Sequence, residues 1–135
     1  MKIAVVGCGA MGSVYAGLLA AAGHDIWAID AWNEHIESIK KNGLRLEGAS
    51  GDRTVKINAS VTASDAGKCD LIILATKTMH VEAAAQTCRD LIGPETLVLS
   101  IQNGLGGPDT AAKVLGKDRV LVGVVGGFGA SIKAP

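Results

Sequence analysis

The fold is decided near the start of the chain, where residues 2–12 read Lys-Ile-Ala-Val-Val-Gly-Cys-Gly-Ala-Met-Gly. The apolar run that ends at Val6 is typical of a buried parallel strand. Small and apolar residues from Ala10 to Ala22 predict a helix that is closed by Gly23. A glycine loop that follows a strand and opens a helix favours a dinucleotide site over a turn in which the glycines serve packing alone.

The three glycines of this loop have separate expected roles. Gly7 permits the tight turn, Gly9 lets the backbone approach a pyrophosphate, and Gly12 allows the helix to pack closely on the strand. The unpaired N–H groups and the positive dipole end of the helix would then point at the phosphates. We therefore predict that a cofactor binds the whole loop, which consists of Gly7, Cys8, Gly9, Ala10, Met11 and Gly12.

Strands and helices continue to alternate along the chain. Further strands are predicted at 25–30, 71–74, 97–100 and 120–125, and further helices at 34–41, 79–92 and 109–115, the first of them with Asn33 as its N-cap. Residues 44–46 and 54–57 flank a glycine-rich turn and predict a small hairpin. Right-handed crossovers then predict an α/β Rossmann fold, in which residues 1–135 form one domain around a doubly wound parallel sheet of strand order 3-2-1-4-5-6, with the hairpin as an insertion.

Asp30 closes the second predicted strand, at the distance of about 20 residues from the loop where dinucleotide sites carry an acid. Its carboxylate could accept hydrogen bonds from the adenosine ribose hydroxyls, and its charge would repel a 2′-phosphate. Ala31 and Trp32 follow, so no arginine stands beside it to bind such a phosphate. NAD is therefore predicted in preference to NADP, the alternative being that Asp30 is a solvated acid at a strand end.

Composition narrows the class of protein. Hydrophobic residues make up 48% and charged residues 19%, a balance typical of globular domains. The 13 basic and 13 acidic residues cancel, so neither nucleic acid nor a membrane is predicted as a partner. The cysteines are odd in number and have no C-x-x-C pair, which predicts reduced thiols in the cytoplasm and neither disulfides nor a metal site; they are Cys8, Cys69 and Cys88.

Two later motifs are more specific than the glycine loop. Ala75-Thr76-Lys77 follows the strand at 71–74, and Gln102-Asn103-Gly104-Leu105-Gly106 follows the strand at 97–100. Together with the loop they resemble the ketopantoate reductase family, from Lys2 to about Ala130. The resemblance implies an oxidoreductase in which a nicotinamide cofactor reduces a 2-oxo acid, 2-dehydropantoate or a related one, to the D-2-hydroxy acid.

The resemblance also implies roles for individual residues. Lys77 matches the family lysine that reaches the cofactor, and Asn103 matches the asparagine that bridges nicotinamide ribose and substrate, so both are expected to bind cofactor and to support catalysis. Gly129 and Ala130 match a stretch whose backbone touches the cofactor again. The family's main catalytic lysine and glutamate lie in a later helical domain and are expected beyond Pro135, so this chain alone is expected to bind cofactor without turnover.

One departure and two alternatives bear on function. Asp30-Ala31 stands where NADP-preferring members carry an arginine, which resembles the NAD-dependent D-2-hydroxyacid dehydrogenases of the family and leaves the 2-oxo acid open. A regulatory NAD-binding domain of a potassium channel or transporter is one alternative, although such a domain has no need of Lys77 and Asn103. Dehydrogenases of the 6-phosphogluconate or glycerol-3-phosphate type are another, and the Gln102-Asn103-Gly104 run speaks against them. Homo-oligomerisation is left open.

Overall fold

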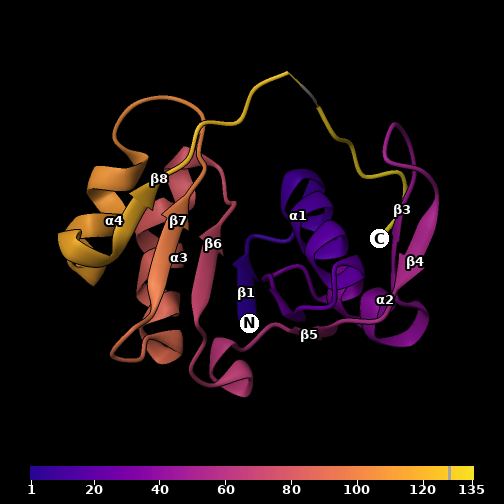
Figure 1. Cartoon of the computed structure of the whole chain (residues 1–135), viewed down its shortest axis with the longest axis horizontal. Helices are drawn as coiled ribbons and strands as arrows, with labels where there is room; N and C mark the ends of the chain where they lie inside the picture. Colours follow the sequence, from indigo (N-terminus) through magenta and orange to yellow (C-terminus); the bar gives the residue numbers. More distant parts are fainter. Residues whose placement is uncertain (128) are drawn as a thin grey trace.

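The computed structural model describes residues 1–127 and 129–135. Its centre is a six-stranded sheet in which every neighbouring pair is parallel, in the order β5-β2-β1-β6-β7-β8 (Figure 1). The strands of this sheet are β1 (Lys2–Val6), β2 (Asp25–Ile29), β5 (Asn58–Ser60), β6 (Leu71–Leu74), β7 (Leu97–Ser100) and β8 (Val120–Val122). Counted within this sheet alone, their order is the predicted 3-2-1-4-5-6, and the Rossmann-like class is confirmed.

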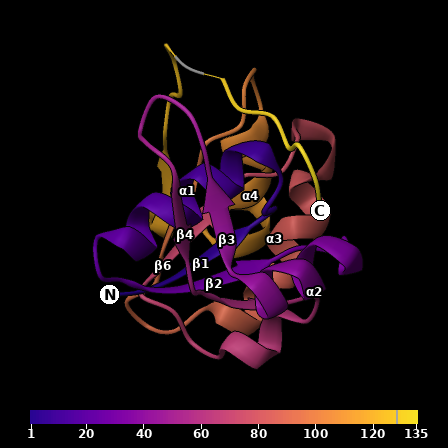
Figure 2. The same ribbon diagram turned by 90° about the vertical axis from the view of Figure 1, so that its right-hand side faces the viewer.

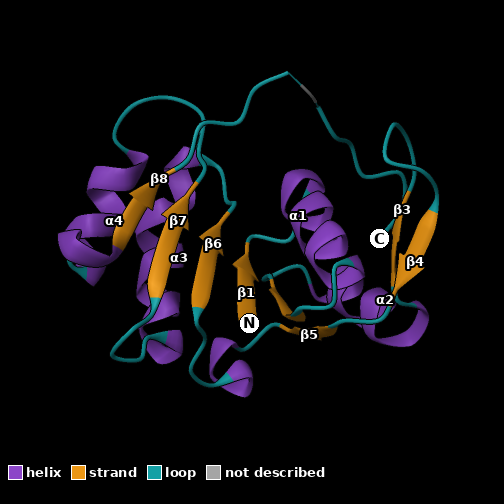
Figure 3. Cartoon of the chain, viewed as in Figure 1, coloured by secondary structure: helices purple, strands orange, loops and turns teal. Residues whose placement is uncertain are grey.

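Helices cover the sheet on both faces (Figure 3). They are α1 (Ala10–Ala21), α2 (Asn33–Asn42), α3 (Val81–Cys88) and α4 (Gly107–Leu115), with short 3-10 turns at Ala63–Ala66, Thr78–His80, Arg89–Leu91 and Lys117–Arg119. Helix α1 packs on β1 and β2, and α2 packs on β5, around the fully buried Ile3, Val5 and Ile36. Helices α3 and α4 pack on β6 to β8 around Ile72, Leu74 and Val98. Each face of the sheet thus has its own apolar core.

The predicted hairpin is present as a separate two-stranded sheet. Strands β3 (Leu44–Leu46) and β4 (Arg53–Val55) pair antiparallel and lie against the outer side of α1 (Figure 2). The contact is close because Gly17 lacks a side chain: a Cβ there would lie 2.5 Å from Cδ1 of Leu46. The hairpin therefore extends the α1 side of the molecule and leaves the six-stranded sheet uninterrupted.

The central strands end side by side. Val6 is in register with both Ile29 and Leu74, and Leu74 is in register with Ser100. Beyond these ends, the Ala75 amide donates to the Val6 carbonyl at 2.8 Å and the Ile101 amide donates to the Leu74 carbonyl at 3.2 Å. The loops that follow β1, β6 and β7 consequently emerge at one edge of the sheet, as doubly wound folds require.

Several local predictions differ from the structure. The helix predicted at 79–92 is α-helical only over Val81–Cys88, and the hairpin strand predicted at 54–57 is Arg53–Val55. The third strand of the sheet is Asn58–Ser60, which is too short and polar to show a strand pattern and exists because its backbone pairs with β2. Strand β8 was predicted to reach residue 125 but ends at Val122, because its partner β7 ends at Ser100, opposite Val122. Asn33 was predicted as an N-cap, yet it is the first residue of α2, and Trp32 holds the N-cap position.

Over the described ranges, no helix combines the length and the apolar character that crossing a membrane would demand.

Candidate functional site

The turn after β1 is built so tightly that two of its glycines are required by packing. Gly7 has a φ of +91°, and its amide donates to the Ile29 carbonyl at 2.9 Å. A Cβ on Gly7 would lie 2.6 Å from Cγ2 of Thr76 in the neighbouring loop. A Cβ on Gly12 would lie 2.1 Å from the Gly7 carbonyl oxygen, which real structures do not tolerate. The predicted roles of these two glycines, a tight turn and a close approach of helix to strand, match this geometry.

Gly9 differs from its two neighbours because packing does not require it. Its φ is −71°, and no described atom would come within 4 Å of a Cβ built there. The first bond of α1 runs from the Ser13 amide to the Gly9 carbonyl at 2.8 Å, and no side chain of the described residues caps the helix. The amides of residues 10–12 precede that bond and so have no acceptor within the helix. Free N–H donors and the positive end of a helix dipole therefore adjoin open space, which suits an anionic group.

Cys8 lies in the middle of the loop but faces inward. Its side chain is fully buried, and its carbonyl accepts a hydrogen bond from Oγ of Ser13 at 3.1 Å. Burial raises the pKa of the Cys8 thiol to about 12, a second contact of Ser13, between its Oγ and the Cys8 Sγ at 3.6 Å, opposes the shift, and the nearby charge of Asp30 adds to it. Cys8 can therefore offer a ligand only its backbone, and its thiol is not an activated nucleophile.

Asp30 lies beyond the end of β2 and directly follows Ile29, whose carbonyl accepts the hydrogen bond from the Gly7 amide of the glycine loop. Its Oδ1 accepts a hydrogen bond from the Trp32 amide at 2.9 Å, and its second carboxylate oxygen has no hydrogen-bond donor among the described residues. The Trp32 ring is stacked on His35, with centroids 5.1 Å apart. The predicted acid thus lies just beyond the second strand, and the turn that starts α2 holds it in place.

His35 is a residue that the sequence did not single out, because its helix appears polar. It is 4% exposed and its Nε2 lies 3.5 Å from Oγ of Ser13 in the first turn of α1. Its Nδ1 has no hydrogen-bond partner among the residues that the structure describes. The imidazole therefore connects Trp32 to the helix that follows the glycine loop.

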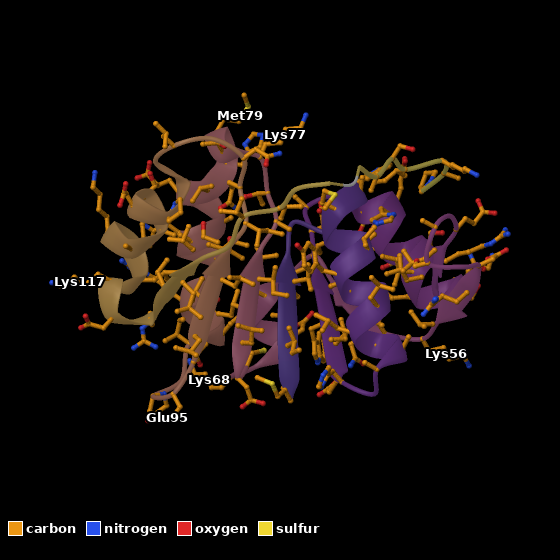
Figure 4. The ribbon with its side chains drawn as sticks, turned by 45° about the horizontal axis from the view of Figure 1, so that its top comes forward. Lys56, Lys68, Lys77, Met79, Glu95 and Lys117 are labelled. Atoms are coloured by element: carbon orange, nitrogen blue, oxygen red, sulfur yellow. The ribbon has the colours of Figure 1, made fainter. Side chains whose placement is uncertain are left out.

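Lys77 and Asn103 lie on the two neighbouring loops that follow β6 and β7. Both are exposed, and Figure 4 shows Lys77 at the edge of the molecule where the strands end. Oγ1 of Thr78 donates to the Asn103 carbonyl at 2.8 Å, so the two loops are in direct contact. The sequence placed Lys77 and Asn103 at one edge of the sheet, but it did not predict the hydrogen bond that Thr78 makes between their loops.

Ala130 is located differently from the other predicted residues. It is exposed and belongs to the segment 129–135, which approaches the hairpin (Figure 1). Ala10 and Ala130 line the same cavity of about 780 Å³, which is bounded by α1, α2 and the hairpin. Lys77 and Asn103 are not among its lining residues. Ala130 thus lies on a cavity that reaches Ala10, and Lys77 and Asn103 do not line that cavity.

A comparison with protein-family models matches residues 3–135 to the family described as ketopantoate reductase PanE/ApbA. Among curated proteins, the chain is 40% identical over 136 aligned positions to a 2-dehydropantoate 2-reductase of Pyrococcus horikoshii, covering 100% of this chain and 42% of that protein. It is 36% identical over 127 residues to the 2-dehydropantoate 2-reductase of Lactococcus lactis, covering 91% of this chain and 40% of that one. The chain therefore spans about two fifths of the length of these relatives.

Solved structures agree with the family match. A PanE/ApbA family ketopantoate reductase from Ralstonia eutropha superposes with a TM-score of 0.89 at 34% identity, covering 100% of this chain and 44% of the other. A D-mandelate dehydrogenase solved with NADH and anilino(oxo)acetate superposes with a TM-score of 0.84 at 34% identity, covering 92% of this chain and 40% of the other. None of these relatives supports the alternative of a regulatory domain of a channel or transporter.

Proposed function

Because the chain belongs to the ketopantoate reductase PanE/ApbA family, we propose that it is the cofactor-binding domain of an oxidoreductase that transfers hydride between a nicotinamide cofactor and a 2-oxo acid. The main support is the corner between β1 and α1. There, the free amides of residues 10–12 adjoin open space in front of Gly9, and the Asp30 carboxylate lies beside the same loop. Amides at a helix N-terminus and an acid after the second strand are the two elements that a dinucleotide needs.

The residues present fit this group. In the proposed complex, the loop amides donate to the pyrophosphate, and the free oxygen of Asp30 accepts from the adenosine ribose hydroxyls. The fully buried Cys8 side chain packs inside the protein beside the loop and would not contact the ligand. The space in front of Gly9 is where the phosphates would approach, since a side chain there would meet no protein atom within 4 Å over the described residues.

Lys77 and Asn103 are proposed to act at the reacting end of the site. When bound, a nicotinamide ring supplies the hydride chemistry. The Lys77 ammonium carries three donors and would hold ribose or carboxylate oxygens near the reacting carbon. The Asn103 amide both donates and accepts, so it would orient a ribose hydroxyl and the substrate oxygen together. These contacts position the reactants, which lowers the entropic part of the barrier.

NAD is the cofactor that we propose in preference to NADP, and the substrate is proposed to be 2-dehydropantoate or a branched or aromatic 2-oxo acid. The Asp30 carboxylate would repel a 2′-phosphate, and Ala31 offers no charge to compensate. The similar D-mandelate dehydrogenase was solved with NADH, which supports this choice.

Titration of NADH and NADPH against the chain and against Asp30→Ala tests the proposal. We expect the wild-type chain to bind NADH more tightly than NADPH. Loss of hydrogen bonds to a charged acceptor should weaken NADH binding about tenfold in the variant and leave NADPH binding nearly unchanged. Asp25→Ala is a matched control, because Asp25 begins the same strand at its opposite end. Failure of the wild-type chain to bind either nucleotide would overturn the proposed function, and equal losses for both would overturn the NAD preference alone.

A further inference from the structure

We propose that Thr78 and Gln102 are positioning residues that clasp the Lys77 loop to the Asn103 loop and so fix the nicotinamide end of the site. The inference rests on the proposed function, and it assigns a role to two side chains that would not themselves contact the reactants. The clasp consists of two hydrogen bonds between segments that are far apart in sequence.

The first bond is made by Thr78. Its Oγ1 donates to the Asn103 carbonyl at 2.8 Å across a sequence separation of 25 residues. Thr78 directly follows Lys77 and begins a 3-10 turn in which the His80 amide donates to the Lys77 carbonyl at 2.9 Å. The 3-10 turn at Thr78–His80 therefore holds the Lys77 backbone through His80 and the Asn103 backbone through Thr78.

The second bond is made by Gln102, which directly precedes Asn103. Its Nε2 donates to the Leu74 carbonyl at 2.8 Å, and its Oε1 is hydrogen-bonded to Oγ of Ser100. Leu74 is the last residue of β6, and its carbonyl also accepts from the Ile101 amide. Both lone pairs of that carbonyl are thereby occupied, and the start of the Asn103 loop is joined to the end of β6.

The clasp is needed because few other contacts fix the positions of the two loops that it joins. Lys77 and Asn103 are both exposed, and no hydrogen bond from either side chain is found among the described residues. The Asn103 loop continues through Gly104 and Gly106, which have φ of +92° and +91°. Glycines leave a loop with much conformational freedom, so a fixed distance between Lys77 and Asn103 must come from contacts such as those of Thr78 and Gln102.

The Lys77 loop also approaches the glycine loop, through a residue outside the clasp. Thr76 lies between β6 and Lys77, and its Cγ2 would be 2.6 Å from a Cβ on Gly7. Loosening the Thr78 bond should nevertheless act on one half of the site only. The amides at the start of α1 and the Asp30 carboxylate belong to the other half, which would hold the adenosine and phosphates. Lys77 and Asn103 would hold the nicotinamide ribose.

Thr78→Val tests the clasp, because valine keeps the shape of threonine and removes the donor. Thr78→Ser restores the donor and should restore the wild-type behaviour. Thr87→Val is the matched control: Thr87 is also exposed, and its Oγ1 donates to the Ala83 carbonyl at 3.1 Å within α3. Two measurements are made on each protein: the backbone mobility of residues 77–79 and 103–105 by 15N relaxation, and the dissociation constants of NADH and of 5′-AMP.

We expect Thr78→Val to increase mobility in both segments and to weaken NADH about fivefold, the loss typical of one neutral hydrogen bond, while 5′-AMP binding stays unchanged. Unchanged mobility in Thr78→Val would overturn the clasp whatever the nucleotides do. Equal weakening of NADH and 5′-AMP, or the same effects in Thr87→Val, would also overturn it, because they would indicate a general loss of structure. A wild-type chain that binds neither nucleotide would refute the proposed function, and the relaxation data would still decide the clasp.

Discussion

The two halves of the candidate site are built from different parts of the chain. The corner between β1 and α1 is made of backbone, held by Gly7, Gly12 and the inward-facing Cys8. The edge formed by the loops after β6 and β7 is made of exposed side chains joined through Thr78 and Gln102. The first half is part of the packed core, so a change there should cost stability. The second half lies outside the core, so a change there should cost binding and leave the fold intact.

The largest effect should come from adding one methyl group to the packed half. In Gly12→Ala the new Cβ would lie 2.1 Å from the Gly7 carbonyl oxygen, so backbone must move to accept it. We expect a loss of about 3 kcal/mol in the free energy of unfolding, measured by urea denaturation, at the upper end of the usual cost of overpacking. A stability equal to that of the wild type would mean that the corner is not held by packing.

A second effect of burial should appear at high pH. The pKa of the Cys8 thiol is about 12 in the folded chain, against an ordinary value of 9.0. Between pH 9 and pH 12 the folded chain therefore keeps a proton on this thiol that the unfolded chain has lost. The stabilising contribution is complete below about pH 9 and falls as pH rises towards 12, by about 1.4 kcal/mol per pH unit. Unfolding by urea at about pH 8.5 and about pH 10.5 should therefore show a loss of about 2 kcal/mol from this thiol.

Cys8→Ala should remove that part of the pH dependence. Cys88 has its own pKa raised to about 12 by burial, so it should maintain a similar contribution in the Cys8→Ala protein. A pH dependence that is identical with and without Cys8 would show that this thiol is accessible to water in the folded protein.

The smallest of these effects should separate binding from stability within one loop. Gly9→Ala places its methyl in open space, so the free energy of unfolding should fall by at most about 1 kcal/mol, the cost of a poorer N-cap. The same methyl should weaken NADH binding about tenfold, because it occupies the space in front of the loop. Calorimetry would measure this affinity. If Gly9→Ala behaved like Gly12→Ala, destabilised and equally unable to bind, the distinction between the two glycines would be wrong.

The sequence predicted the packed half well, for a physical reason. A buried apolar strand, a glycine pattern and an apolar helix are local signals, and here they agree with the global fold. The sheet order followed from the handedness of crossovers and did not depend on recognising β5, whose residues Asn58–Ser60 show no pattern of their own. The end of β8 at Val122 could not be predicted, because it depends on where β7 stops.

The exposed half was predicted less completely. The family resemblance pointed to Lys77 and Asn103, and the topology put them at one edge of the sheet. The hydrogen bonds of Thr78 and Gln102 were not predicted, because a bond between residues 25 or 28 positions apart leaves no periodic trace in a sequence. The burial of His35 was not predicted either, because its helix is polar in sequence and its contact with Ser13, 22 positions away, forms only in the folded chain.

Each side of the sheet contains a buried cysteine whose reaction with a thiol reagent can report local opening of that side. Cys8 belongs to the core under α1 and α2, and Cys88 belongs to the core under α3 and α4, both with no exposed surface. A thiol reagent can reach either sulfur only when that layer opens, so the rate at which each cysteine is labelled reports the opening of one layer. Mass spectrometry of partly labelled protein would show whether the two layers open together or one before the other.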